Sequence, residues 1–478
     1  MKISKYIAYA AFGFVALSGC SKQLDLKPTD TINESNGYRT INDAQLGVNG
    51  AYSRYTALFN DLFLTSLLSD EAKLGADNAG QGALTYRYQI TSESGDIQGG
   101  YASYYTMIDQ INRVLVALPG VSVNPNNVAF EEERRKQLKG QLLALRGLAH
   151  FGLLNSFCKN YDPSGKGVPI MLTPDPAAKP AHNTMGEVMT RIETDMADAY
   201  ALLPVTTAAN FTDTVMNRLN IDAYRAKIAL YKGDFTGAIG YANTVIGQLG
   251  TVSKDLATGA AYNSIWTQST YPVLPEVLFR IRNATSVTQG SFWTTGANTV
   301  YIAQSDKLTG LYAAADIRKA AFIGSLPAGS GTKPYVKKHE TVMAAGNRVT
   351  DLKAIRSAEI YLIRAEAYAR QAAPNLAGGT ADLNTLRAKR ITGYVNVPNF
   401  VTAADLLSAV LEERFKELCF EGSRFFDLKR NNLPVSRALT DVTSTAWQTL
   451  PAGDNFFTMP IPLAELQANP NAVQNPGY

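Results

Sequence analysis

Residues 411–430 read LEERFKELCFEGSRFFDLKR, in which charged residues are laid over an apolar repeat. Leu411, Phe415 and Leu418 recur at the i, i+4, i+7 spacing that places side chains on one face of a helix. This spacing predicts a helix over about 403–421 with a buried apolar face. A helical core element is therefore expected close to the C-terminus.

The charged residues of this stretch interleave at helical spacing, where opposite charges three or four positions apart attract. Gly422 follows the predicted helix and permits the turn that ends it. We interpret Arg424 and Asp427 as a structural ion pair, and Arg364 and Glu366 in the same way. These charges are expected to diagnose the fold and not to form the binding site.

Helical periodicity extends over much of the chain, and helices in pairs with a tight Gly turn between them are typical of tetratricopeptide (TPR) repeats. Because the pairs lie far apart in the sequence, distant parts of the chain must pack together. The expected helices cover about 42–58, Tyr104–Leu115, Glu131–Phe157, a segment from the capping box Thr184-x-x-Glu187 to Pro204, two helices joined at Gly233-Asp234, and a late pair, Ile360–Tyr368 and Leu383–Ala388, separated by Gly378-Gly379.

Three regions break this pattern. Residues 251–350 are rich in Gly, Thr, Ser and aromatic residues and contain an extended-looking run at Val277–Ile281. Residues 60–100 and 431–478 are expected to be irregular as well. Loops of this length inside a compact domain are uncommon and often carry function.

The N-terminus has the form of a secretory signal peptide over 1–19, with two lysines followed by an apolar stretch too short to span a bilayer. Leu17-Ser18-Gly19-Cys20 resembles a bacterial lipobox, which predicts lipidation of Cys20 and a lipid-anchored linker over 20–40. The alternative is an ordinary signal peptide with an incidental cysteine. Because no other stretch has 18 consecutive apolar residues, no membrane-spanning segment is expected.

The composition, 46% apolar and 18% charged with a net charge of +4, is that of one large globular body. No basic block is present, which argues against nucleic-acid binding. Two cysteines remain besides Cys20, and buried free thiols at Cys158 and Cys419 are favoured over a disulfide, which an exported protein could still form. No Cys/His cluster has metal-ligand spacing, and no cofactor is expected.

Several blocks in order along the chain together resemble the SusD/RagB family. The resemblance implies a mainly α fold, with four TPR-like helix pairs forming a right-handed superhelical scaffold and a loop-rich, partly β part packed alongside. It also implies a helical N-terminal part over 41–250 and a C-terminal part over 251–478 that holds the irregular loops and the last pairs. The blocks are LLALRGLAHF (142–151) with GVPI (167–170), RAEAY (364–368) with LNTLRAKR (383–390), residues 411–430, and MPIP (459–462) with QNPGY (474–478).

A sugar offers C–H faces, which aromatic rings cover, and hydroxyls, which polar side chains satisfy. The long loops supply both kinds of residue, and family knowledge places the site of a starch-binding member in these two regions. The predicted ligand-binding residues are Asp77, Asn78, Tyr86, Tyr88, Asp96 and Tyr101 in the loop 75–101, and Trp266, Phe292, Trp293 and Tyr301 in the loop 262–301.

For each of these aromatic residues, packing in the core is an open alternative. Trp266 has apolar neighbours, whereas Trp293 is favoured as exposed. Gly99-Gly100-Tyr101 stands where the starch-binding member leads us to expect tryptophan, so starch itself is in doubt.

The resemblance implies a non-enzymatic, lipid-anchored outer-membrane protein that faces the cell exterior. It would capture oligosaccharides and deliver them to a SusC-like TonB-dependent transporter. Capture of peptides or glycopeptides, as in the RagB branch, is the alternative. An enzyme is disfavoured because the sequence has no nucleophile elbow, metal motif or phosphate loop. A pure TPR scaffold is disfavoured by the long aromatic loops and the export signal.

Overall fold

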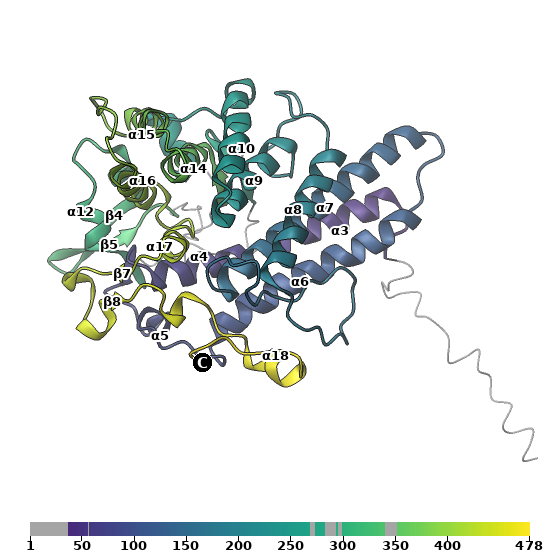
Figure 1. Ribbon diagram of the computed structural model, residues 1–478, viewed down its shortest axis with the longest axis horizontal. Helices are drawn as coiled ribbons and strands as arrows, with labels where there is room; N and C mark the ends of the chain where they lie inside the picture. The colour runs from purple at the N-terminus through teal and green to yellow at the C-terminus, as the bar shows by residue number, and fades with distance from the viewer. Residues whose placement is uncertain (1–36, 56, 268–272, 283–292, 295–298, 340–350) are drawn as a thin grey trace, which may run out of the picture.

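A computed structural model describes residues 37–478 except 56, 268–272, 283–292, 295–298 and 340–350, and the side chains of 57–60 are likewise not described. The signal peptide, Cys20 and most of the predicted linker lie outside the described residues. The described chain is mainly helical with small β portions, as expected (Figure 1).

Four helices from the first third of the chain pack against one another, and all but the second of them extend to one end of the molecule (Figure 1). The predicted irregularity of residues 60–100 is wrong in part, because a helix fills residues 57–68. Residues 61–68 of this helix are all buried, so no polar face marks a helical period in its sequence. The helices are α3 (Ile41–Arg54), α4 (Ala57–Leu68), α6 (Gly95–Ala117) and α7 (Val128–Phe157), with a short α5 (Ala83–Tyr86) between α4 and α6.

The later helices pack in consecutive pairs, and α10 also packs against α14, so pairs distant in sequence meet as expected. The predicted capping box is present, because the Thr184 hydroxyl accepts from Glu187 N and the Glu187 carboxylate accepts from Thr184 N. Gly233 adopts φ +86° in the turn between α9 and α10, a left-handed conformation that suits glycine. The pairs are α7 with α8 (Met185–Leu202), α9 (Arg218–Lys232) with α10 (Phe235–Gln248), α14 (Ser357–Arg370) with α15 (Leu376–Arg390), and α16 (Ala403–Leu418) with α17 (Arg424–Arg430).

One predicted helix boundary is wrong. Gly378 and Gly379 lie inside α15 and not in the turn before it, because Asn375 caps the helix and accepts a hydrogen bond from Gly378 N at 2.9 Å. Gly379 lies against Leu406, and a Cβ at this position would come within 2.6 Å of that side chain. The two glycines therefore serve capping and helix packing.

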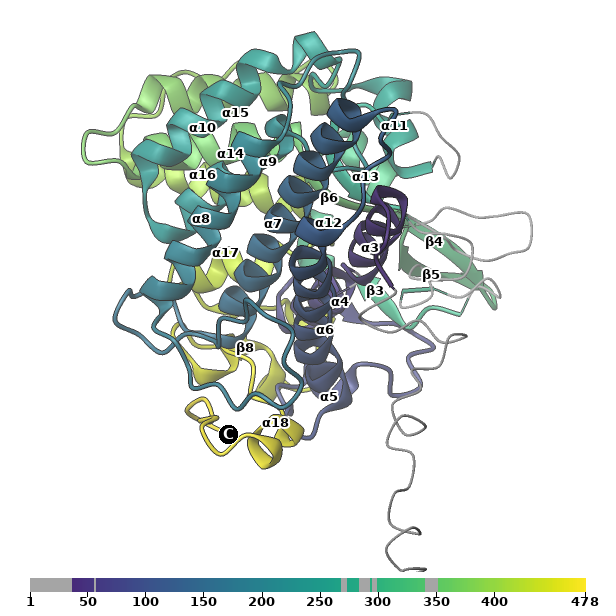
Figure 2. The same cartoon turned by 90° about the vertical axis from the view of Figure 1, so that its right-hand side faces the viewer.

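Strands are short and form two-stranded antiparallel sheets in the described chain. The extended run at Val277–Ile281 is confirmed as a fully buried strand. The hairpin of β4 and β5 projects from the body (Figure 2). The paired strands are β1 (Ala72–Leu74) with β3 (Ile302–Gln304), β2 (Val277–Ile281) with β6 (Leu352–Arg356), β4 (Ile323–Ala328) with β5 (Gly331–Val336), and β7 (Val435–Ser436) with β8 (Thr449–Leu450).

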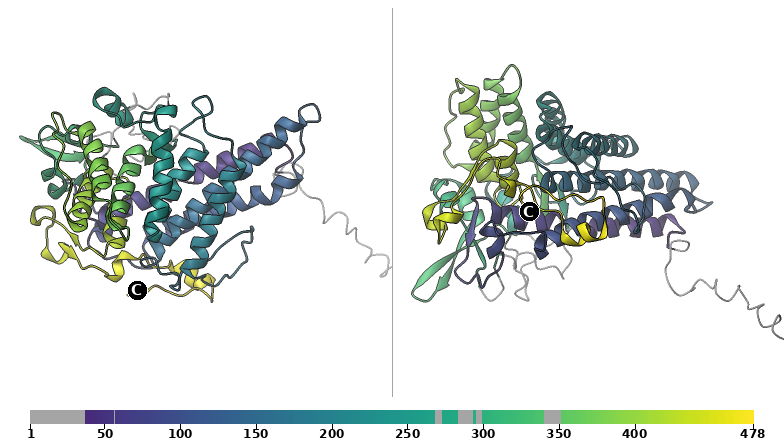
Figure 3. Two further views of the ribbon diagram at one scale, coloured as in Figure 1. Left: turned by 45° about the horizontal axis from the view of Figure 1, so that its top comes forward. Right: turned by 60° about the horizontal axis from the view of Figure 1, so that its bottom comes forward.

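Four further short helices occur in this part of the described chain: α11 (Gly259–Thr267) precedes β2, α12 (Asp306–Gly310) and α13 (Ile317–Phe322) lie between β3 and β4, and α18 (Leu463–Ala468) follows β8. The C-terminal stretch, yellow in Figure 1, runs along the bottom of the molecule from β8 to α18. It reaches both the helices and the loop-rich part, which the two views of Figure 3 show from other sides.

A network of buried ion pairs joins the helices to the loop-rich part. Glu417 on α16 is fully buried and accepts from three guanidiniums, those of Arg318, Arg356 and Arg390, at 2.9–3.2 Å. The three arginines come from α13, β6 and α15, so a single carboxylate fixes three elements. Burial alone would raise the pKa of Glu417, but the three guanidiniums outweigh it and hold that pKa well below its usual range.

The predicted ion pairs are structural, as expected, but their partners differ from the prediction. Arg424 donates to Asp70 at 2.7 Å, and Asp427 pairs with Arg414 at 2.8 Å and with Arg430. The second predicted pair, Arg364 with Glu366, also has other partners. Arg364 contacts Asp382, and Glu366 contacts Arg430. Each of these four charges thus has a partner on another element, and neither of the two predicted pairings forms an ion pair.

The expectation of two buried free thiols is confirmed for Cys158 and Cys419. Within the described residues, no helix has the length and apolar character needed to cross a bilayer, and no His/Cys/Asp/Glu group has a metal-binding arrangement.

Candidate functional site

The structure brings parts of the two predicted loops together beside β1 and β3. Asn78 Nδ2 donates to Tyr301 O at 2.9 Å, and Asp77 Oδ2 accepts from Val300 N at 2.9 Å. Gly75 allows this close approach, because a Cβ there would lie 2.2 Å from Val300 O. We call this place, formed by residues 75–78 with 300–301, the loop junction.

The loop junction is part-exposed and charged. Lys333 on β5 bonds Asp77, and the side chains are 15% and 37% exposed respectively. The Lys333 ammonium and the Val300 N–H hold the pKa of Asp77 below its ordinary value. The polar groups of Asp77 and Asn78 are thus engaged in holding the loops, and their contact with a ligand stays a prediction, as does that of half-buried Tyr301.

Tyr86 and Tyr88 are 1% and 9% exposed and enclose the guanidinium of Arg437. Its central carbon lies 3.9 Å from the Tyr86 ring centroid and 4.6 Å from that of Tyr88. Arg437 also donates to four backbone carbonyls, of Leu67, Ser69, Tyr86 and Trp447. Both tyrosines are therefore packed in the core, which was the alternative to ligand contact. In this conformation their ring faces are closed to a sugar.

The two predicted tryptophans are also buried, each 2% exposed. Trp266 packs edge-on against Phe322 at 5.1 Å between ring centroids, as the core alternative expected. The expected exposure of Trp293 is wrong, because its ring stacks on His339 at 5.8 Å and meets Phe420 edge-on at 5.3 Å. Phe292 lies outside the described residues.

Tyr101 borders an open groove of about 570 Å³ between the first turns of α6, the segment 169–180 and the start of α18. We call this the tyrosine groove. Its volume falls in the range of ligand-binding clefts, roughly 300–1,000 Å³. Asp96, in the first turn of α6, is exposed near this end of the helix but does not line the groove. The groove is lined by Gln98, Tyr101, Ala102, Tyr105, Thr106, Asp109, Pro169, Met171, Thr173, Asp175, Pro176, Ala178, Pro180, Pro462, Ala464 and Glu465.

The groove combines aromatic and apolar walls with hydrogen-bonding groups. The rings of Tyr101 and Tyr105 meet at 4.8 Å between centroids, and the Tyr105 hydroxyl donates to Pro169 O at 3.0 Å. Tyr101 is only 5% exposed, so half-buried Tyr105 presents more of the aromatic surface.

The acids of the groove are partly engaged. Glu465 Oε1 accepts from Asn469, and Asp109 pairs with Arg113 at 2.8 Å. The side-chain amide of Gln98 makes no hydrogen bond to any residue that the structure describes. The groove therefore offers amide and carboxylate groups beside a ring face, which is the pairing of surfaces that a sugar requires.

Most of the residues that line the tyrosine groove were not predicted, although a pattern in the sequence marks some of them. Tyr101, Tyr105 and Asp109 stand at i, i+4 and i+8, one face of a helix, and Gln98 lies one turn earlier on the same face. Reading residues 95–117 as a helix with two faces would have selected them. Met171 and Glu465 join from other parts of the chain, and no local pattern marks them.

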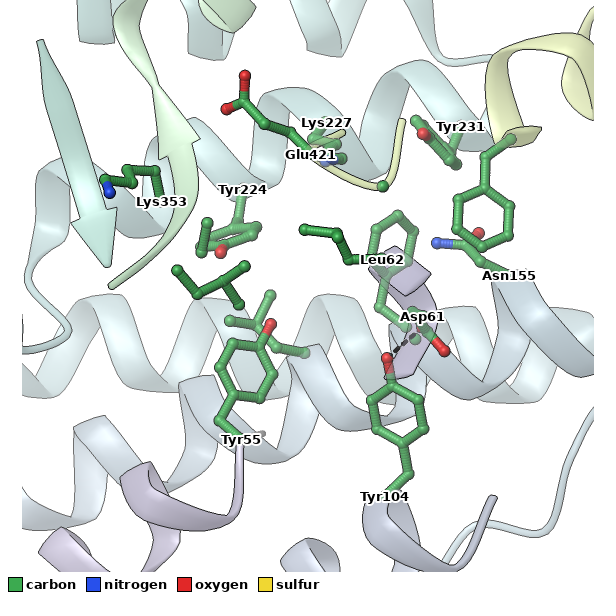
Figure 4. A pocket seen from close by; sticks show the side chains of 17 residues that line it. Tyr55, Asp61, Leu62, Tyr104, Asn155, Tyr224, Lys227, Tyr231, Lys353 and Glu421 are labelled. Carbon is green, nitrogen blue, oxygen red and sulfur yellow. Dashed lines mark hydrogen bonds between the residues drawn. The ribbon is translucent and has the colours of Figure 1, made fainter. Parts of the chain in front are cut away.

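A second hollow lies in the interior, where Tyr104 points toward Asp61 (Figure 4). Its volume, about 60 Å³, suits a few water molecules and is too small for a sugar ring. Burial raises the pKa of Asp61 to about 7, although hydrogen bonds from Tyr104 and from Ser156 lower it. We assign this cavity to the interior of the fold and not to ligand binding.

Comparison with known proteins places both halves of the chain in one family. A sequence model described as "SusD family" matches residues 280–478, and one described as "Starch-binding associating with outer membrane" matches residues 24–230. The chain is 23% identical to SusD-like protein P2 of Formosa agariphila over 97% of this chain and 98% of that protein.

Solved structures share the fold. A SusD superfamily protein from Bacteroides thetaiotaomicron superposes with a TM-score of 0.78 at 24% identity, covering 91% of this chain and 100% of the other. A structure described as a laminarin-binding SusD-like protein superposes with a TM-score of 0.70 at 22% identity, covering 92% of this chain and all of that one.

Proposed function

This chain belongs to the SusD/RagB family, and we propose that it captures oligosaccharides at the cell surface and delivers them to a SusC-like TonB-dependent transporter. It is a binding protein and not an enzyme. The family description associates it with the outer membrane. Lipidation of Cys20 would tether it there through the linker 20–40, with the folded body facing the exterior.

The tyrosine groove is our candidate for the site of capture. The observation that carries this choice is the meeting of Tyr105 with Gln98 and Glu465 in one open groove. A pyranose ring would place its C–H face on the tyrosine, while amide and carboxylate groups bond its hydroxyls. The helices would act as a rigid frame, and we propose that the four TPR-like pairs wind into a right-handed superhelix.

Direct binding tests the proposal. The mature protein would be titrated by calorimetry with laminarin-derived and starch-derived oligosaccharides, because the relatives are described as binding laminarin and starch. We expect binding without release of shorter products. Gln98→Ala should weaken it about tenfold, the effect of losing a hydrogen bond worth about 1.4 kcal/mol.

Gln89→Ala is the matched control, because Gln89 is an exposed glutamine that precedes α6 and does not line the groove. It should leave affinity unchanged. Equal loss in both variants would contradict the groove as the site, and binding of peptides but no glycan would replace sugar capture with peptide or glycopeptide capture. Hydrolysis of the sugars would contradict a role in binding alone.

A further inference from the structure

A second open pocket, of about 600 Å³, lies between the end of α7, the start of α8 and the C-terminal stretch. Nothing in the proposed function uses it. Three lysines line it, Lys159, Lys166 and Lys429, and we call it the lysine pocket. Both this pocket and the tyrosine groove border the C-terminal stretch, the first at residues 473–476 and the second at Pro462–Glu465.

Lys429 is 7% exposed, and its ammonium donates only to backbone carbonyls, those of Asn155 and Cys158. Lys166 likewise donates to Val473 O at 2.9 Å and to Gln474 O at 3.0 Å. Among the residues that the structure describes, neither ammonium forms an ion pair. A lysine has three N–H donors, so each keeps one beyond these two bonds.

Buried lysines elsewhere in the molecule have carboxylate partners. Lys338 contacts Glu421 at 2.6 Å, Lys254 lies 3.6 Å from Asp213, and Lys416 lies 3.3 Å from Glu413. A buried ammonium without an anion is costly, because burial removes its hydration without an opposite charge in return. Lys429 therefore differs from these lysines, because no residue in the described part of the chain supplies it with a counter-charge.

A structural role explains part of this arrangement. Asn155 and Cys158 end α7, and a cation at a helix C-terminus is favoured by the helix dipole. That role needs neither Lys159 nor Lys166 in the same pocket. Burial lowers the pKa of Lys429 to about 8, so its charged form still dominates at neutral pH.

The acids of the pocket do not neutralise these lysines. Asp162 accepts from the amide and the hydroxyl of Ser164, and Asp454 accepts from Phe456 N at 2.9 Å. Asn160 lines the pocket and donates from its side-chain NH2 to Lys429 O at 2.8 Å, and its side-chain carbonyl oxygen is an acceptor suited to a hydroxyl. The pocket thus has three ammonium groups against two engaged carboxylates.

We propose that the lysine pocket binds the anionic group, a carboxylate or a sulfate ester, of an acidic sugar. The proposal rests on glycan capture and adds a ligand class, sugars that carry negative charge. The anion would take the third N–H of Lys429 and of Lys166, with Lys159 at the rim, while the sugar hydroxyls reach Asn160.

The test compares trigalacturonate with its uncharged methyl ester, both titrated against the full mature protein at low salt. A sulfated oligosaccharide of equal length forms a further arm and separates sulfate from carboxylate recognition. We expect the acid or the sulfated sugar to bind at least tenfold more tightly than the ester, with a preference that shrinks as salt is added.

Lys159→Gln should reduce that preference about threefold to tenfold without changing the melting temperature, since Lys159 is exposed and its side chain bonds none of the residues that the structure describes. Lys429→Gln should abolish the preference, and it is to be compared only if its circular dichroism matches the parent. Lys136→Gln, at an exposed lysine remote from the pocket lining, is the control.

Equal binding of acid, sulfated sugar and ester would overturn the proposal. So would a charge preference that the Lys159 and Lys429 variants leave intact, because the anion would then sit elsewhere. Neutral laminarin-derived oligosaccharides report on the tyrosine groove in the same protein. Their binding, with no charge preference, would leave the proposed function standing while the lysine pocket fails.

Discussion

The network around Glu417 and the tyrosine groove use the same chemical groups in opposite ways. Glu417 is fully buried, and every oxygen of its carboxylate meets a guanidinium. Glu465 in the groove is part-exposed, and among the described residues its carboxylate bonds only Asn469, through one oxygen. A carboxylate whose partners are all internal holds the fold, whereas one with an oxygen to spare can bind an outside molecule.

The difference also separates the residues that mark the family from those that form the candidate site. The stretch 411–430 supplies Glu417, Glu421 and Asp427 to interior ion pairs. The groove draws instead on the first turns of α6, on a loop and on the C-terminal stretch. Members can therefore share the charged core while their grooves differ, and recognition of the family leaves the ligand open.

The largest effect is expected from breaking the core network. Glu417→Gln removes one charge and leaves Arg318, Arg356 and Arg390 facing a neutral amide. Loss of one partner from a buried ion pair costs about 3–5 kcal/mol, so the free energy of unfolding in urea should fall by that amount.

The control for this variant is Glu193→Gln, at an exposed pair in which Glu193 is 44% and Lys232 32% exposed. Surface pairs contribute about 0–1 kcal/mol. A loss below 1 kcal/mol for Glu417→Gln, equal to the control, would show that the network does not hold the fold.

The next effect concerns Asp61 in the interior cavity. Its pKa is about 7 in the folded state and 3.8 when exposed, so the folded state binds its proton more tightly. Stability from this group is complete below about pH 4 and is lost as the pH rises to about 7. At 1.4 kcal/mol per pKa unit, a pKa difference of about 3 corresponds to a loss of about 4 kcal/mol.

Asp61→Asn should remove this pH dependence, and urea unfolding from pH 4 to pH 8 measures it. Asp198→Asn, at an exposed site, is the control and should keep the parent's slope. If the parent and Asp61→Asn lose stability in parallel as the pH rises, Asp61 is ionised in the folded state and our assignment fails.

The sequence predicted the long helices that have two distinct faces, and it missed α4 and the short helices such as α5, α11 and α18. The capping residues Thr184 and Glu187 mark the start of helix α8 in the sequence. Residues 61–68 of α4 are all buried, so its sequence shows no alternation of polar and apolar faces. The ion pairs were predicted as structural, but with neighbours in sequence as partners, because nothing local shows that Asp70 will face Arg424. Local sequence patterns thus predict helices, whereas the partners of an ion pair are set by tertiary contacts.

The same limit applies to the candidate site. An aromatic residue in a loop can turn inward or outward, and partners distant in sequence decide which. Trp293 is covered by His339 and Phe420, neither of which its surroundings in sequence reveal. Tyr101 was predicted as an aromatic residue of the loop 75–101, yet Tyr105, one helical turn later, offers the more open ring face.

A smaller effect is expected in the groove. Glu465→Gln keeps the shape and the bond to Asn469 but replaces a charged acceptor with a neutral one. Glycan affinity should fall by about 1 kcal/mol, roughly fivefold, while the melting temperature stays the same. Calorimetry with the tightest-binding oligosaccharide measures the change. Unchanged affinity would place the sugar away from α18.

The smallest effect is expected at the loop junction, which shares features of both regions because its ion pair is part-exposed. Lys333→Met removes the partner of Asp77 but leaves the bond from Val300 N. Because the pair is part-exposed, its loss should change the free energy of unfolding only slightly. The pKa of Asp77 should rise toward its ordinary value, and NMR titration of its carboxyl carbon follows that rise.

Arg134→Met, next to Asn42 on an exposed helix face, is the control for loss of a surface cation and should leave Asp77 unchanged. If Lys333→Met also weakens glycan binding, the loop junction takes part in recognition, as the prediction for Asp77 and Asn78 requires. If it shifts the Asp77 pKa alone, the two loops are joined there for structure and the sugar is bound in the groove. An unmoved pKa would mean that Lys333 does not pair with Asp77 in solution, because an exposed ion pair exists only where its attraction exceeds the cost of ordering two side chains.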